Sequence, residues 1–103
     1  MLTKFYRKNT SADATGTLFT LKEGIITNVI MYNDNDIEAT VKLISSDGMI
    51  FFNRTLAAKE DIIVQLDTYT NNTETIQFYS SLAEVHCNLN FLSKIYININ
   101  CNF

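Results

Sequence analysis

The stretch EVHCNLNFLSKIYININCNF, residues 84–103, alternates between apolar and polar side chains over almost its whole length. Its odd positions from Val85 to Phe103 are apolar apart from Ser93, whereas most even positions are Asn, Glu, His or Lys. A period of two places successive side chains on opposite faces of a β-strand. The stretch is much longer than the usual strand of about 5 to 6 residues, so it either bends or projects beyond the domain toward a partner.

A helix is the alternative interpretation at the start of this stretch. Ser81-Leu82-Ala83-Glu84 has the spacing of a capping box, which often begins a helix. Asn88 and Asn90, together with the regular alternation, favour a strand instead.

The rest of the chain reads as short strands separated by turn-forming residues. Asn33–Asp36 predicts a tight reversal, Asp47-Gly48 predicts a hairpin, and residues 56–61 read as a turn. Residues 67–73 read as a polar loop. The expected strands cover residues 17–21, 25–32, 37–43, 49–55, 62–66, 75–79 and the final stretch.

Seven or eight strands with these short connections predict an all-β fold, an antiparallel β-sandwich of the jelly-roll or immunoglobulin-like kind. We expect a single domain over residues 1–103. Within it, residues 1–16 are predicted to form an N-terminal arm and loop, residues 17–97 the sandwich, and residues 98–103 a C-terminal extension.

Composition argues against several classes of function. The net charge is −3 and the basic residues are scattered, so we expect no nucleic-acid partner. No apolar run approaches the roughly 20 residues of a membrane helix and no export signal is evident, so we expect no membrane partner. Cys87 and Cys101 are expected to be reduced thiols in a protein made in a reducing cytoplasm.

The sequence lacks the usual arrangements of reactive residues. His86 is the single histidine, and it lies on the polar face of the last strand without a nucleophile motif nearby. Cys87 follows it directly, so the two side chains point to opposite faces and cannot bind one metal ion together. The turn Asn33–Asp36 lacks the later glycine and acidic residue of a calcium loop. We therefore expect no enzyme, no catalytic, cofactor-binding or metal-binding residue, and no cofactor.

Four pieces of sequence, in order, are similar to one family of proteins. They are GIITNVIMYNDND (24–36), IEATVKLISSDG (37–48), RTLAAKEDIIVQL (54–66) and ETIQFYSSLAEVHCNLNFLSKIYI (74–97). Together, the segment Leu21–Ile97 resembles the small β-sandwich structural proteins found in the head, neck and tail regions of tailed-bacteriophage virions.

This resemblance implies a structural subunit in a symmetric homo-oligomer at the neck, tail or capsid surface. It would be located in the virion after synthesis in the host cytoplasm, and its partners would be further copies of itself and other virion proteins. Arms at both ends of the chain could contact neighbouring subunits by adding strands to their sheets. The expected intersubunit contacts are Leu2, Phe5, Tyr6, Ile97, Ile99 and Phe103.

Two alternatives stay open from the sequence. The first is a capsid decoration protein. The second is a carbohydrate-binding module used in host attachment, with Tyr32, Tyr69 and Tyr79 as a platform on which a host-surface sugar stacks.

Overall fold

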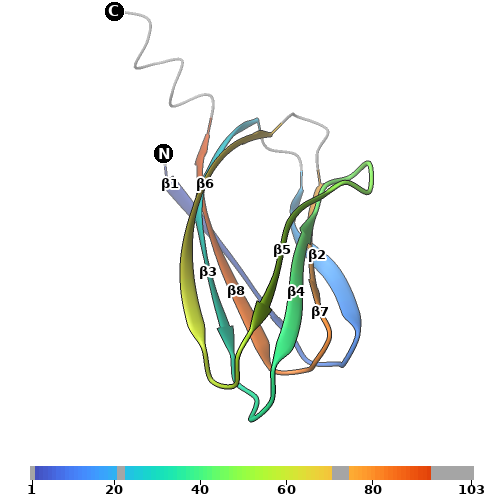
Figure 1. Cartoon of the computed structure of the whole chain (residues 1–103). Coiled ribbons are helices and arrows are strands. Elements are labelled where there is room, and N and C mark those ends of the chain that lie inside the picture. Colours follow the sequence, from blue (N-terminus) through green and yellow to red (C-terminus); the bar gives the residue numbers. More distant parts are fainter. Residues whose placement is uncertain (1, 21–22, 71–74, 94–103) are drawn as a thin grey trace, which may run out of the picture.

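The computed structural model describes residues 2–20, 23–70 and 75–93, which form a sandwich of two β-sheets (Figure 1). The described strands are β1 (Leu2–Asn9), β2 (Ala14–Thr20), β3 (Gly24–Asn33), β4 (Ala39–Ile44), β5 (Ile50–Leu56), β6 (Asp61–Thr70), β7 (Thr75–Ser80) and β8 (Val85–Ser93). The prediction of an all-β sandwich with seven or eight strands is confirmed.

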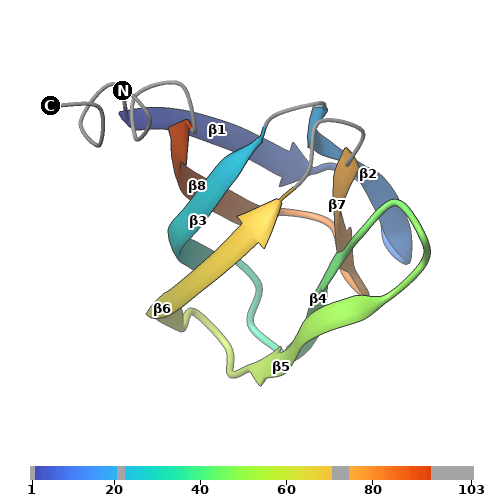
Figure 2. The same cartoon turned by 90° about the horizontal axis from the view of Figure 1, so that it is seen from above.

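The strand order identifies the type of sandwich. Sheet A has the order β1-β8-β3-β6 and sheet B the order β2-β7-β4-β5 (Figures 1 and 2). The chain pairs β1 with β8, β2 with β7, β3 with β6 and β4 with β5, and every pair is antiparallel. This nested pairing over two four-stranded sheets is that of a jelly roll, so the immunoglobulin-like alternative is wrong.

The core lies between the two sheets, where alternation along the strands directs apolar side chains. In β8 the buried positions are Val85, Cys87, Leu89 and Phe91, and the residues between them are half-buried. The other large, fully buried side chains include Ile26, Met31, Leu43, Leu56, Ile76 and Phe78. Burying each such side chain stabilises the fold by about 1.5 to 3 kcal/mol before entropy is counted.

The region before β8 does not form a helix. Residues 81–84 form a bend, and Glu84 has a positive φ of 59° that ends any helical path. The backbone N–H of Glu84 donates a hydrogen bond of 2.7 Å to the carbonyl of Asn9. The strand prediction for this region is therefore confirmed as far as Ser93. The predicted extension at residues 98–103 lies outside the described residues.

The expected N-terminal arm over residues 1–16 is corrected by the structure. Residues 2–9 form β1, which pairs along its whole length with β8 of the same chain, and β2 already begins at Ala14. The physical reason is that β8 would otherwise leave one row of backbone donors and acceptors unpaired. The sandwich thus begins well before residue 17.

The segment after Asn33, predicted as a tight reversal, links the two sheets. Strand β3 belongs to sheet A and β4 to sheet B. Asn33 is fully buried at this corner, and its side-chain Nδ2 donates to the carbonyls of Ile37 (2.8 Å), Leu56 (3.4 Å) and Ala57 (3.0 Å). Its Oδ1 accepts hydrogen bonds from the backbone N and the Nδ2 of Asn35.

Several turns are joined by hydrogen bonds at this same end of the sandwich. Asp13 N donates to Ser81 O, Lys59 N to Asn35 O, and the side chain of Asn35 to the carbonyl of Ala83. At the opposite end of sheet A, Leu2 of β1 lies opposite Leu92 of β8. The first strand therefore starts, and the last described strand ends, at the end away from these linked turns (Figure 1).

Two further predictions concern turns. The hairpin between β4 and β5 forms as predicted, with Gly48 at a φ of 86°. The loop expected at residues 67–73 is corrected over residues 67–70, because β6 continues to Thr70, and residues 71–73 lie outside the described part of the chain. Asp67, with a φ of 50°, lies where the pairing of β6 with β3 shifts register, and this bulge lets the strand continue.

No helix of membrane-spanning length and hydrophobicity occurs in the described ranges.

Candidate functional site on the outer face of sheet A

The outer face of sheet A is built from rows of side chains that lie opposite one another across its four strands. One row is wholly apolar or aromatic and consists of Leu2, Leu92, Ile25 and Tyr69. A second row consists of Tyr6, Asn88, Ile30 and Ile63. Between these two rows runs a polar one, Lys4, Asn90, Asn28 and Gln65, in which Asn90 Nδ2 lies 2.5 Å from Asn28 Oδ1.

Large apolar side chains are strongly exposed on this face. The exposed fractions are 57% for Leu2, 56% for Tyr6, 74% for Ile63 and 76% for Tyr69. Among the described residues, only Ile37, Met49 and Ile50 are comparable apolar side chains elsewhere on the surface. Exposed apolar groups gathered on one face commonly mark an interaction surface, whereas single scattered ones do not.

The outer face of sheet B is more polar and provides an internal comparison. One of its rows consists of Thr15, Tyr79, Lys42 and Asn53, and another of Thr17, Gln77, Ile44 and Ile50. The aliphatic residues of this face are confined to one corner, where β4 and β5 meet. The contrast singles out sheet A as the side of the sandwich that is suited to a protein partner.

Aromatic rings gather where the row of Lys8, His86 and Tyr32 meets the neighbouring row of Tyr6, near the linked turns. The ring of His86 lies between those of Tyr6 and Tyr32, with centroid separations of 5.9 and 5.8 Å. The hydroxyl of Tyr6 lies 2.6 Å from His86 Nδ1, and the hydroxyl of Tyr32 donates to Asp34 Oδ1 over 3.3 Å. The polar atoms of these three side chains therefore contact one another or Asp34 of the adjoining turn, which orients the rings.

Two ion pairs border this row. Lys59 Nζ lies 2.9 Å from Asp34 Oδ1, and Lys8 Nζ lies 3.2 Å from Glu84 Oε2. The hydrogen bond and charge of Lys59 lower the pKa of Asp34, and the same hydrogen bond raises the pKa of Lys59. All four groups are exposed to solvent, so their contribution to stability is small. They place fixed charges at the rim of this face.

The residues predicted as intersubunit contacts are found in different environments. Leu2 and Tyr6 lie on the outer face of sheet A and are exposed. Phe5 points to the interior, where it packs against the core and meets Phe91 edge to face with ring centroids 6.3 Å apart. The other three predicted contacts, Ile97, Ile99 and Phe103, lie outside the described residues.

The structure does not bring together the three tyrosines considered as a sugar platform. Tyr32 and Tyr69 lie in different rows of sheet A, at opposite ends of the face, and Tyr79 lies on the outer face of sheet B. Tyr79 donates a 2.6 Å hydrogen bond to Asp13 Oδ1, which raises the pKa of its hydroxyl, and Lys42 Nζ lies 5.2 Å from its ring centroid. No two of these three rings form a shared surface.

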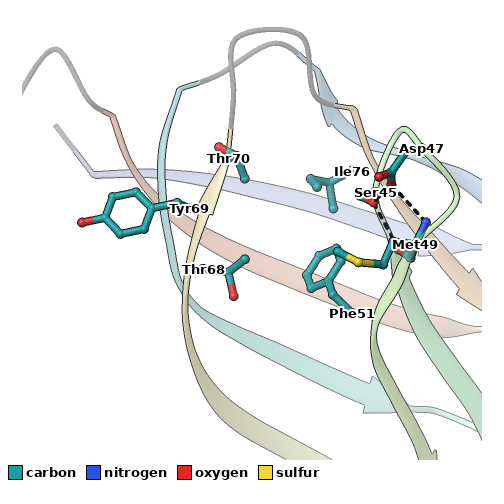
Figure 3. Close-up of a pocket in the computed structure, with 8 residues that line it drawn as sticks. All are labelled: Ser45, Asp47, Met49, Phe51, Thr68, Tyr69, Thr70 and Ile76. Carbon is teal, nitrogen blue, oxygen red and sulfur yellow. Dashed lines mark hydrogen bonds between the residues drawn. The ribbon is translucent and has the colours of Figure 1, made fainter.

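A small hollow of about 90 Å³ opens between the end of β6 and the β4–β5 hairpin (Figure 3). Its lining residues are Ser45, Asp47, Met49, Phe51, Thr68, Tyr69, Thr70 and Ile76. The Tyr69 ring points away from the hollow, whereas Phe51, Met49 and Ile76 lie toward it. Pockets for small-molecule ligands usually have about 300 to 1,000 Å³, so this hollow suits a single side chain better.

Residues with reactive side chains are not gathered into a centre in the described part of the chain. No group of three or more His, Cys, Asp or Glu there could hold a metal ion. Cys87 is fully buried, and burial raises the pKa of its thiol far above the ordinary value, which suppresses the reactive thiolate.

Comparisons with known proteins give the fold and no family. No family model matches the chain, and no curated protein sequence matches it. Solved structures do match. A Bacillus endospore appendage protein, described as forming disulfide-linked pili, shows a TM-score of 0.60 at 13% identity, over 90% of this chain and 87% of that one.

Two further solved structures are similar over comparable lengths. PirA has a TM-score of 0.55 at 10% identity, over 86% of this chain and 93% of that one. The module CsCBM6-3 from Clostridium stercorarium, solved in complex with cellobiose, has a TM-score of 0.54 at 12% identity, over 89% of this chain and 82% of that one. At these identities the likeness shows a shared β-sandwich fold, and one fold serves many functions.

Proposed function

We propose that this chain is a structural protein of a tailed-bacteriophage virion that works as a homo-oligomer at the neck, tail or capsid surface. Its role is packing and the exchange of strands or arms, and not catalysis. The observation that carries the proposal is the outer face of sheet A, where one row of apolar and aromatic side chains crosses all four strands and the edge strands β1 and β6 carry strongly exposed apolar side chains. The sequence resemblance of residues 21–97 to virion β-sandwich proteins supports the location.

The size of the face indicates how it would be used. Four strands spaced about 4.8 Å apart, each with about eight residues at about 3.4 Å, give roughly 500 Å² of projected surface. Stable interfaces bury about 800 Å² on each partner. The face therefore supplies a large part of an interface, and exchange of a chain segment would provide a second contact. The same fold in pilus-forming endospore appendages supports the use of such a sandwich as a repeating subunit.

Location in a virion is tested directly on particles. In phage particles purified by density gradient from cells that carry the gene, peptides of this chain are expected in the same fraction as the packaged DNA. Mass spectrometry of each fraction provides the measurement. If the peptides remain with free host proteins at the top of the gradient, the virion role is wrong.

Self-association is tested by native mass spectrometry of the full chain. Tyr6→Lys places a charge on the outer face of sheet A and is expected to raise the dissociation constant of the oligomer about tenfold or more, because buried tyrosines often dominate interfaces. The control Ile37→Lys introduces the same charge at a side chain that is 63% exposed in the loop between β3 and β4. It should leave the oligomer unchanged. A monomeric full chain, or equal weakening by both variants, would contradict the proposal.

A further inference from the structure

The core is covered unevenly at the two sides of the sandwich. On one side, β1 packs against β2 and β7 of the other sheet. The edge strands β5 and β6 lie on the other side. They carry most of the apolar side chains that pack on the core but stay half-exposed. These are Phe51 and Phe52 on β5 and Val64 and Leu66 on β6. The hollow lined by Met49 and Phe51 opens on the same side.

Strand β6 also offers an open backbone edge. Among the described strands it pairs only with β3, so one row of its backbone donors and acceptors faces outward. Proteins usually protect such edges with charged side chains, especially lysine. The edge strand β1 carries Lys4 and Lys8 and the edge strand β5 carries Arg54, whereas the edge strands β2 and β6 have no Lys or Arg. Strand β2 lies on the side of the sandwich where β1 packs against it, whereas β6 lies on the open side. Its sequence Asp-Ile-Ile-Val-Gln over residues 61–65 strongly favours strand pairing.

The sequence contains a segment that suits this edge. Residues 95–103 continue the alternation of β8, and their odd positions are Ile95, Ile97, Ile99, Cys101 and Phe103. The odd positions of β8 face the core, so a straight continuation keeps its apolar side chains on the corresponding side. Such a segment needs a sheet edge for its backbone and an apolar cover for one face.

We propose that residues 95–103 of one copy add as a strand to the β6 edge of a second copy, with their odd-numbered side chains covering the opening between β5 and β6. This inference rests on the proposed homo-oligomer and assigns its second contact. The added strand would bury Val64 and Leu66, and one of its side chains would fill the hollow beside Phe51. The mode is strand addition, in which backbone hydrogen bonds give affinity and side-chain pockets give register.

A second copy fits better than the chain's own C-terminal residues. To reach beyond its own β6, the segment would cross about three strand spacings, roughly 14 Å, which uses four or five residues at about 3.3 Å each. Residues 94–103 contain no glycine or proline to turn the chain, and the alternation resumes at once at Ile95. Charge does not oppose the pairing, because β6 carries Asp61 and Asp67 whereas residues 95–103 contain no acidic side chain.

Disulfide trapping in the full chain tests the assignment. The acceptor variants are Val64→Cys and Leu66→Cys, and the donors are the native Cys101 or, in a Cys101→Ser background, Ile97→Cys or Ile99→Cys. At least one acceptor and donor pair should form a dominant intermolecular disulfide under mild oxidation, seen by non-reducing electrophoresis and mass spectrometry. Paired residues on adjacent strands lie within disulfide range. Cys87 does not compete, because it is fully buried.

Matched controls separate the alternatives. Ile63→Cys lies on the opposite face of β6 and should not crosslink to the odd-numbered donors. A disulfide between two copies of Val64→Cys in a Cys101→Ser background would show direct β6–β6 pairing and overturn the assignment, as would a crosslink within one chain. The oligomer formed by a chain shortened to end at Lys94 should have a dissociation constant about tenfold higher or more than that of the full chain.

The failure of this inference can be distinguished from failure of the proposed function. If the full chain is oligomeric by native mass spectrometry but no acceptor and donor pair crosslinks, the strand-addition assignment is wrong and the oligomer stands. If the full chain is monomeric at all concentrations, both are wrong.

Discussion

Replacing Asn33 with alanine is expected to lower the free energy of unfolding by about 3 kcal/mol. The side chain is fully buried, and its amide group donates to three backbone carbonyls, those of Ile37, Leu56 and Ala57. Alanine removes these donors without letting water in, and each buried polar group left without a partner costs about 1 to 3 kcal/mol. Urea denaturation followed by circular dichroism measures the change.

Two comparison variants show whether hydrogen bonding is the cause. Asn53→Ala changes the same residue type at an exposed position of β5 and should alter stability by less than about 0.5 kcal/mol. Asn33→Asp keeps the shape but presents carboxylate oxygens to carbonyl oxygens, so it should be at least as damaging as alanine. Near-native stability of Asn33→Asp would contradict this account.

Replacing Gly24 with alanine is expected to lower the free energy of unfolding by about 3 kcal/mol, which is the upper end of the usual range for overpacking a core. A Cβ built at Gly24 lies 2.2 Å from the backbone oxygen of Leu92 and 2.7 Å from the Phe91 ring. Because the closest atom belongs to the backbone of β8, it cannot move aside without separating β3 from β8. Thermal unfolding should show a lowered midpoint, and hydrogen exchange should increase first in residues 85–93.

Gly16 is the matched control, because its crowding has a different source. A Cβ there would approach the guanidinium of Arg7 to about 1.9 Å. That group is the far end of a flexible side chain, so it can shift if it gives up the 2.7 Å hydrogen bond from Arg7 Nε to Asn9 Oδ1. Gly16→Ala should therefore lower the free energy of unfolding by less than about 1.5 kcal/mol. Equal losses at the two glycines would contradict the distinction between backbone and side-chain contacts.

Much of the fold could be predicted because its signals are local. Alternation identified β8 as a strand, and the Asp47-Gly48 hairpin and the strands around it depend on neighbours in the sequence. Strand β1 was missed because it is an edge strand whose inward positions include Arg7, so its apolar pattern is weak. The longer β6 was missed because a bulge at Asp67 carries it through residues that favour turns.

The candidate site depended on information that the sequence pattern does not contain. Tyr6 could be singled out as an exposed aromatic residue near one end of the chain. Other residues of the same row, such as Ile63, come from β6, more than fifty residues away, and are aligned with it only through the pairing register of four strands. The buried amides of Asn9 and Asn33 were missed for a similar reason, because asparagine in a turn usually faces water.

The jelly roll has two unlike ends, and this gives the subunit a direction. At one end β1 starts and β8 stops, whereas at the other the bonds among Asp13, Ser81, Asn35 and Ala83 tie the connecting turns together. In a ring or lattice anchored through the first end, the second would point outward as a stiff, well-ordered tip. Short peptides inserted there, for instance after Ala58, would be displayed on the particle surface while every strand kept its partners.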